Sequence, residues 1–187
     1  ELYRDVKSTV LFKNDWHKGV VGIVASRVME KYYRPTIILT ESNGKATGSA
    51  RSVKGFDVHE AISACADLLE QFGGHKYAAG MTLPLENVEA FRQRFEAVVA
   101  ETILEESLIP EVDIDMELEL SDITPKFYRI MKQFAPFGPG NMSPVFLTKH
   151  LQDDGYARIV GTHHLKLKLG KPGQPSFDAI AFGMAHM

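Results

Sequence analysis

The sequence predicts two domains: an α/β domain over residues 1–106, with helices covering a mixed sheet, and a small antiparallel β domain with one helix over residues 107–187. Strand-like and helix-like segments alternate in the first part, whereas the second part is a series of short β-prone runs. The charge also changes where they meet. Residues 107–122 hold six acids and no base, and residues 123–187 hold eight bases and three acids, a net charge of +5.

Each predicted element of the first domain has a local cause. Apolar, β-branched runs predict strands over Ser8–Lys13, Thr36–Thr40, Lys45–Ser52 and Tyr77–Leu83. Apolar residues at helical spacing predict helices over Val20–Tyr32, Val58–Leu69 and Val88–Thr102. Pro35 ends the first helix, Asn43-Gly44 turns between two strands, Asp57 with Glu60 forms a capping box, and Asn87 caps the last helix.

The second predicted domain begins with a strand that has one solvent-exposed face, because apolar and acidic residues alternate over Val112–Leu120. Pro125 lies near the start of a predicted helix, whose inward residues are Ile123, Phe127, Ile130, Met131 and Phe134. Pro136–Asn141 is rich in Gly and Pro and predicts a shaped loop. Further strands are expected at Val145–Lys149, Tyr156–Val160, Leu165–Leu169 and Phe177–Phe182.

Composition excludes several classes of protein. With 44% apolar and 24% charged residues among 187, the chain is neither disordered nor a repeat protein, and it has no apolar run of the roughly 20 residues that a membrane span needs. The single Cys65 excludes a disulfide framework, suits a reducing cytoplasm and is expected to be a packed, inert thiol. Because the chain opens at Glu1 without an initiator Met or a secretion signal, we expect a segment of a longer protein.

The strongest local signal is Gly73-Gly74-His75, followed by Ala78, Ala79 and Gly80. Two adjacent glycines allow a turn whose backbone amides form an anion-binding concavity, and His75 can add a donor. The small residues that follow leave space beside it. An alternative is a helix C-cap at the two glycines, followed by a tightly packed strand.

Two further groups could hold an anion. Arg51 is flanked by Ser49 and other small residues, so its guanidinium could bind a phosphate through two hydrogen bonds. The alternative is an ordinary salt bridge. His17, Lys18 and Gly19 precede the first predicted helix, whose N-terminus favours negative charge. The alternative for this group is a buried Trp16, with His17 as its polar neighbour and Gly22 allowing close helix packing. Lys76 could add to the positive field or be a solvated surface lysine.

Residues for catalysis or metal binding are missing from the pattern. No carboxylate pair has a spacing that suggests general acid–base catalysis, and the metal-binding patterns H-x-x-x-H and C-x-x-C do not occur. We therefore expect no catalytic residue and no metal ligand in this segment. His163 and His164 would point to opposite faces of a strand and could not chelate one ion.

Basic residues of the second domain suggest a strand-binding surface. Lys166 and Lys168 alternate with leucines, so they share one strand face, and Arg158 is a further candidate. They could contact phosphates. They could equally pair across the sheet with the acidic face of Asp113–Glu119.

Several ordered motifs resemble the RecJ family of single-stranded-DNA-specific exonucleases, in the DHH phosphoesterase superfamily. In the first domain they are Trp16-His17-x-Gly19-Val20-Val21-Gly22, Gly48–Ser52, Gly55-Phe56-x-x-His59-x-Ala61 and Phe72-Gly73-Gly74-His75-x-x-Ala78-Ala79-Gly80. In the second they are Phe134–Asn141 with Pro144, and Val160-Gly161-x-x-His164-Leu165-Lys166. The resemblance implies a DHH-associated domain over residues 1–106 and an OB-type, nucleic-acid-binding domain over residues 107–187.

The resemblance also implies a function. The parent enzyme would hydrolyse phosphodiester bonds of single-stranded DNA in DNA repair and recombination in the cytoplasm, using two Mn or Mg ions held by an N-terminal DHH domain that this segment lacks. Nucleotide phosphates would be held across a cleft from the metals by His17, Gly19, Ser49, Arg51, Gly73, Gly74, His75, Ala78 and Gly80. Phe137, Tyr156 and Phe177 are candidates for base stacking in the OB-type domain, although each is expected to be core. The segment alone is expected to be inactive.

Two other functions are consistent with the same motifs. One is a DHH-family phosphodiesterase for short oligonucleotides or cyclic dinucleotides, against which the appended β domain argues. The other is a non-catalytic nucleic-acid-binding module, as in the similar domains of alanyl-tRNA synthetases.

Overall fold

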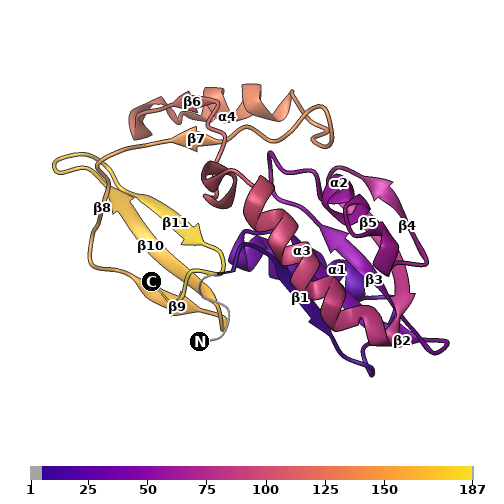
Figure 1. Ribbon diagram of the computed structural model, residues 1–187. Coiled ribbons are helices and arrows are strands. Elements are labelled where there is room, and N and C mark those ends of the chain that lie inside the picture. The colour runs from indigo at the N-terminus through magenta and orange to yellow at the C-terminus, as the bar shows by residue number, and fades with distance from the viewer. Residues whose placement is uncertain (1–5, 187) are drawn as a thin grey trace. The chain divides into compact units, whose positions relative to one another are not determined.

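The protein, represented by a computed structural model that describes residues 6–186, divides into two compact units, Glu1–Glu111 and Val112–Met187 (Figure 1). From the sequence, the division was predicted after residue 106. Residues 1–5 of the predicted first domain lie outside the described residues, as does residue 187. The first unit is a mixed α/β fold and the second is mainly antiparallel β with one α-helix, so the predicted fold class is confirmed.

A five-stranded mixed sheet forms the centre of the first unit. Its strands are β1 (Thr9–Phe12), β2 (Thr36–Ser42), β3 (Lys45–Arg51), β4 (Gln71–His75) and β5 (Ala78–Pro84). Their order across the sheet is β1-β2-β3-β5-β4, with β1 and β2 parallel and the other pairs antiparallel. Asn43 and Gly44 both have positive φ and form the predicted turn between β2 and β3.

Helices pack on both faces of this sheet. They are α1 (Val21–Tyr32), α2 (Val58–Ser63) and α3 (Val88–Thr102), with 3-10 turns at Ala66–Leu68, Leu85–Asn87 and Glu105–Leu108. The larger core joins Phe91 and Phe95 of α3 and Ile62 of α2 to one sheet face, and α3 runs along that face in Figure 1. A smaller cluster joins Val21 and Ala25 of α1 to the other face.

Three details of the predicted helices are wrong. The helix predicted to reach Leu69 ends at Ser63, because the chain tightens into a 3-10 turn that brings Leu68 and Leu69 against the core. Asn87 caps no helix with its side chain, since its Nδ2 instead donates to the carbonyl oxygen of Leu68. The predicted stripe of α1 is only partly buried, with Val20, Val24 and Tyr32 exposed.

Short strands dominate the second unit. They are β6 (Met116–Glu117), β7 (Phe146–Leu147), β8 (Gln152–Asp153), β9 (Arg158–Val160), β10 (His164–Gly170) and β11 (Phe177–Ala181), with a 3-10 turn at Leu120–Asp122 and helix α4 (Pro125–Lys132). The central strand β10 pairs with β11 along one edge and with β8 and β9 along the other, all antiparallel. β6 and β7 form a separate parallel pair.

Two expectations for this unit are wrong. Only Met116–Glu117 of the predicted strand Val112–Leu120 is regular strand, and Val112 is 71% exposed, because its partner β7 is two residues long. Leu118 and Leu120 are buried, as the alternation predicted. Of the helix residues expected to face inward, Phe127 and Met131 are half-buried, whereas Ile123, Ile130 and Phe134 are exposed.

Candidate nucleic-acid interface

Strand register places most of the predicted anion-binding residues on one face of the first sheet. Residues directly opposite each other in an antiparallel pair point to the same face. Arg51 lies opposite Ala78, which lies opposite His75. In the next row of the same face, Ser49 lies opposite Gly80 and Gly80 opposite Gly73. Since α1 packs against β2 and β3 on this face, we call it the α1 face.

The two adjacent glycines are not in a turn, which corrects both interpretations of them. Gly73 and Gly74 lie inside strand β4, and the chain turns at Lys76-Tyr77, between β4 and β5. Gly74 points away from the α1 face and has φ of 150°, and a Cβ there would lie 2.3 Å from the carbonyl oxygen of Ala78. Gly74 is therefore required for close strand packing, because no other residue fits this backbone.

The guanidinium of Arg51 is held on the α1 face by neutral oxygens. Its Nε donates to Oγ of Ser26 at 3.1 Å, and its Nη1 donates to Oγ of Ser49 and to the carbonyl oxygen of Ala50, both at 2.7 Å. Within residues 6–186, Nη2 donates no hydrogen bond and no carboxylate pairs with Arg51, so the salt-bridge alternative is wrong. A half-buried, oriented guanidinium with two unused N–H groups suits a phosphate oxygen.

Ser26 and Gly22 of α1 complete this arrangement. Close packing at Gly22 was part of the alternative interpretation of this segment, whereas the role of Ser26 was not predicted. A Cβ at Gly22 would lie 3.1 Å from Nη2 of Arg51, so glycine lets the helix approach the guanidinium closely. Ser26 also donates to the carbonyl oxygen of Gly22. The four-residue spacing of Gly22 and Ser26 places them on one helix face, which is the only sequence signal for their pairing.

Two exposed histidines have the same local geometry. Nδ1 of His75 accepts from the backbone N–H of Tyr77 at 3.3 Å, and Nδ1 of His17 accepts from that of Gly19 at 3.1 Å. A neutral imidazole whose Nδ1 accepts carries its proton on Nε2, so each ring presents an N–H donor outward. A Cβ at Gly19 would lie 3.0 Å from the His17 ring, which explains the glycine.

The structure does not bring every predicted residue to this face. His17 and Gly19 lie just before α1, and within residues 6–186 no hydrogen bond or ring contact joins His17 to Arg51 or His75. Lys18 is exposed in the same segment. Lys76 lies in the β4–β5 turn over the Tyr77 ring, at 5.7 Å from its centroid, and lines a different cavity together with Asp57 and Glu60. Trp16 is half-buried against the α1 cluster, as its alternative interpretation predicted.

A basic patch lies on one face of the second sheet. Arg158 of β9 is opposite Lys166 of β10, and Lys168 follows on the same face, so the three predicted strand-binding residues share a shallow hollow of about 310 Å³. Tyr156 lines it too, with Nζ of Lys168 at 5.5 Å from its ring centroid. Tyr156 is 67% exposed, so the expectation that it belongs to the core is wrong.

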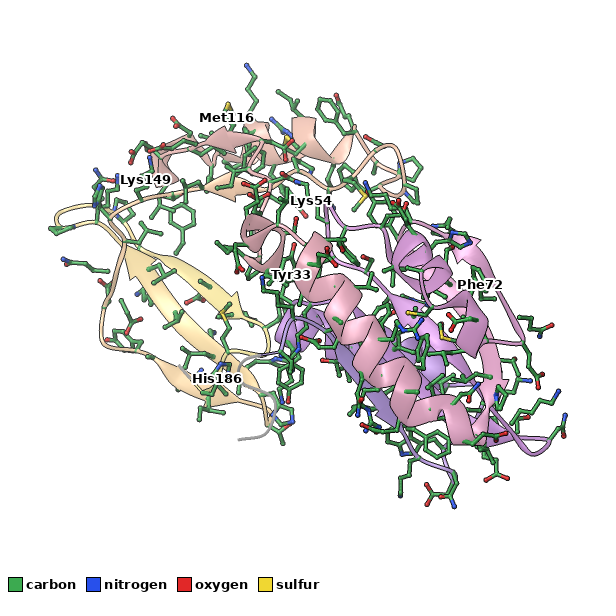
Figure 2. The ribbon with its side chains drawn as sticks, viewed as in Figure 1. Tyr33, Lys54, Phe72, Met116, Lys149 and His186 are labelled. Carbon is green, nitrogen blue, oxygen red and sulfur yellow. The ribbon has the colours of Figure 1, made fainter. Side chains whose placement is uncertain are left out.

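The acidic face of Asp113–Glu119 does not pair with these lysines, which corrects that alternative. Glu117 pairs with Lys149 at 2.6 Å, and Glu119 pairs with Lys171. Lys166 approaches Asp178 of β11 at 3.7 Å. Figure 2 labels Lys149 and Met116, which come from the β6–β7 part of this unit. Two acids are thus neutralised by lysines outside the patch, and the patch keeps a net positive charge.

Neither unit offers a site for a divalent cation among its described residues. In residues 6–186, no group of three or more His, Cys, Asp or Glu side chains converges. The α1 face presents hydrogen-bond donors and a guanidinium, which do not suit Mn²⁺ or Mg²⁺. Burial raises the pKa of the Cys65 thiol to about 11, so this residue is not a nucleophile or a thiolate ligand. No described helix has the length and apolar character of a membrane span.

Family models match both units. A model of the DHHA1 domain matches residues 5–101, and a model of the RecJ OB domain matches residues 114–187. The two matches define the class of the protein: a DHH-associated α/β domain followed by an OB-type domain. The first model covers more than half of the chain.

Comparison with individual proteins shows which members of this class the chain resembles. The single-stranded-DNA-specific exonuclease RecJ of Bacillus subtilis (strain 168) is 37% identical over 98% of this chain, which covers 24% of that protein. The Escherichia coli (strain K12) protein of that name is 32% identical over 93% of this chain and 31% of its own length. The crystal structure of RecJ in complex with Mn²⁺ from Thermus thermophilus matches 97% of this chain and 26% of its own, with a TM-score of 0.79 and 32% identity.

The chain belongs to the RecJ family of single-stranded-DNA-specific exonucleases and is homologous to their C-terminal portion. It spans about a quarter to a third of the length of these relatives and contains no DHH domain. A second Thermus RecJ structure, in complex with Mg²⁺, matches with a TM-score of 0.78 and 32% identity over 96% of this chain and 27% of its own.

Proposed function

We propose that this chain is the substrate-binding portion of a metal-dependent exonuclease that acts on single-stranded DNA. The α1 face would hold a phosphate of the strand with Arg51 and His75, and Ser49 would orient the guanidinium. His17 and Gly19 would contribute a further donor at the start of α1. These roles rest on the geometry of donors and on the resemblance to the family.

One observation supports the proposal most: Arg51 is oriented by two serine hydroxyls, and its Nη2 donates to no described protein atom. This arginine pairs with no carboxylate among the described residues, and it shares a cross-strand row with Ala78 and His75. Two donor groups in one row of an accessible face suit a phosphodiester.

The basic patch of the second unit would extend the binding track. OB-type domains bind single strands through a basic groove and aromatic side chains on which bases stack. Arg158, Lys166 and Lys168 provide the charge, and the exposed ring of Tyr156 is available for stacking. The same features would give binding with little sequence preference and a strong dependence on salt.

Catalysis would need a partner domain. The described residues do not fit a divalent cation, so the Mn or Mg of the proposed reaction would be bound by a DHH domain outside this sequence. That domain would also supply the catalytic residues. The parent enzyme would act in the cytoplasm, in DNA repair and recombination. We propose that the chain alone binds strands without cleaving them.

Binding tests this proposal directly. Fluorescence anisotropy with a labelled single-stranded oligonucleotide should show binding by the 187-residue chain, and Arg51→Ala should weaken it about tenfold or more, as for loss of a charged hydrogen bond. Arg27→Ala is the matched control, because Arg27 is exposed on α1 and pairs with Glu30. Equal affinities of the wild type and Arg51→Ala, with a lowered melting temperature, would instead support a structural role.

A second measurement separates the candidate functions. The purified chain should release no nucleotide from single-stranded DNA with Mn²⁺, and robust release would refute the assignment of catalysis to another domain. Preference for cyclic dinucleotides over longer strands would favour the phosphodiesterase alternative. Comparable binding of double-stranded or transfer RNA would favour the non-catalytic module.

A further inference from the structure

A polar groove adjoins Arg51 on the α1 face, across strands β3, β5 and β4. It has a volume of about 380 Å³, and the polar side chains among its lining residues belong to Thr47, Gln71 and Thr82, while Phe72 and Met81 line it too. Thr47 lies opposite Thr82, and Thr82 opposite Gln71, so these three form one cross-strand row. Oγ1 atoms of the two threonines are 3.3 Å apart. Phe72, labelled in Figure 2, comes from the same β4 strand but packs toward the opposite face.

The groove lies between two rows of different chemistry. On one side is the row of Arg51 and His75, with cationic and N–H donor groups. On the other side is the row of Thr47, Thr82 and Gln71, whose neutral groups both donate and accept. Alternate residues of a strand are about 7 Å apart, so each row lies about 7 Å from the groove floor. The Gln71 amide is exposed and makes no side-chain hydrogen bond within residues 6–186.

The floor is open although the backbone would allow side chains there. Gly73 and Gly80 face each other across β4 and β5, and neither has a φ in the left-handed region. A Cβ at Gly73 would meet no atom within 4 Å, and one at Gly80 would meet only the carbonyl oxygen of Gly48, at 3.8 Å. Folding therefore does not require glycine at these two positions, in contrast to Gly74.

We propose that this groove seats the nucleoside part of the nucleotide whose phosphate Arg51 and His75 hold. The inference rests on the proposed function. A nucleotide carries an anion at one end and neutral donors and acceptors at the other, with a flat ring between them. The α1 face has the matching order: Arg51 and His75, then the open floor, then Gln71 and Thr82. Gln71 is a base-contacting residue in this arrangement, and its rotatable amide can donate to or accept from any base edge, so the groove would favour a base without selecting one.

Two ligands of equal charge test the inference on the 187-residue chain: a short single-stranded oligodeoxynucleotide and an abasic strand of the same length. The wild type should prefer the strand with bases. Gly80→Val fills the groove and should lower affinity for that strand about tenfold, and it should lower affinity for the abasic strand much less. Gly80→Ala, which adds one methyl group, should act in the same direction. Gly138→Ala is the control, since a Cβ there also meets no atom within 4 Å.

Gln71→Ala should lower affinity for the strand with bases about threefold to tenfold, with no effect on the abasic strand. Gln152→Ala, at an exposed glutamine of strand β8, should change neither. Melting temperatures of all variants should stay close to that of the wild type. A large drop for both Gly80→Ala and Gly80→Val would mean that folding requires the glycine and would overturn the inference.

The outcomes separate this inference from the proposed function. If the Gly80 and Gln71 variants bind both strands like the wild type while Arg51→Ala weakens both, the groove seats no nucleoside, although the face still binds phosphate. If Arg51→Ala also leaves both affinities unchanged, the proposed function fails with it.

Discussion

Ser26 of α1 accepts a hydrogen bond from Nε of Arg51 on β3, at 3.1 Å, and so joins the helix to the strand at the candidate phosphate site. The same hydroxyl donates to the carbonyl oxygen of Gly22, which lies against the guanidinium. The orientation of Arg51 thus depends on a helix 25 residues earlier in the chain.

Ser26→Ala should weaken binding of single-stranded DNA more than it affects folding. The substitution removes one hydrogen bond that orients Arg51, so we expect affinity to fall about threefold to tenfold and stability to change by less than about 1 kcal/mol. Anisotropy and urea unfolding measure the two effects. Ser63→Ala is the matched control, because Ser63 makes the same bond to the carbonyl four residues earlier, on α2. Equal losses of affinity in both variants would contradict the role of Ser26.

His75→Gln should retain more affinity than His75→Asn. The amide nitrogen of glutamine reaches the position of Nε2, whereas asparagine reproduces only the Nδ1 end that accepts from Tyr77. We expect about a threefold loss for Gln and about a tenfold loss for Asn and Ala. The exposed His163, in the second unit, serves as the control position. A ranking with Asn above Gln would show that the local turn, and not the outward donor, is what binding needs.

Gly74→Ala should destabilise the first unit by about 2 kcal/mol or more, because φ of 150° and a contact at 2.3 Å exclude a Cβ. Its neighbour offers an internal comparison. Gly73→Ala should leave the free energy of unfolding within about 1 kcal/mol of the wild type. Thermal or urea unfolding checks both. Similar behaviour of the two variants would contradict the strand assignment of this motif.

Alkaline pH should reduce the contribution of Cys65 to stability. Burial raises the pKa of its thiol from 9.0 to about 11. The Arg94 charge lowers this pKa and the Asp67 charge raises it, and both effects are smaller than that of burial. The unfolded chain therefore loses the thiol proton above pH 9, while the folded chain keeps it until about pH 11. The stability advantage over Cys65→Ala should be constant below pH 9 and should shrink between pH 9 and 11. Urea unfolding across that range measures it, and a constant difference would contradict the shift.

Lys166→Ala should reduce the salt dependence of strand binding. Each phosphate contact adds about 0.7 to the slope of log affinity against log salt for single strands, so one lost contact should lower the slope by about that amount. Lys149→Ala is the control, because Lys149 pairs with Glu117 outside the patch. Anisotropy titrations at several salt concentrations give both slopes. An unchanged slope for Lys166→Ala would show that Lys166 makes no contact with a phosphate of the strand.

Much of the fold was predictable because its signals are local. The run Thr36–Thr40 is fully buried in β2, as its continuous apolar character predicted, and Asn43-Gly44 forms the expected turn. Pro125 begins α4 after Thr124, whose Oγ1 accepts from the backbone N–H of Phe127. Such features depend on the φ preferences, caps and periodicity of a few neighbouring residues.

Where prediction failed, distant partners decided the outcome. Alternation in Val112–Leu120 predicted a long strand, but the length of a strand depends on its partner, and β7 pairs with only two of its residues. Gly73-Gly74 was expected in a turn, since local rules cannot distinguish glycines that turn the chain from glycines that pack against a neighbouring strand. The alternative that paired Lys166 and Lys168 with the acidic face is wrong, because the fold pairs Glu117 and Glu119 with Lys149 and Lys171.

Residue types alone identified the groups with the chemistry to bind an anion: Arg51 among small residues, and histidines beside glycines. That Arg51, His75 and Gln71, from strands β3 and β4, share one face on either side of an open groove became visible only in the folded sheet. The reason is register. Side chains alternate along a strand, so β5, lying between β3 and β4, determines which residues of the three strands point the same way.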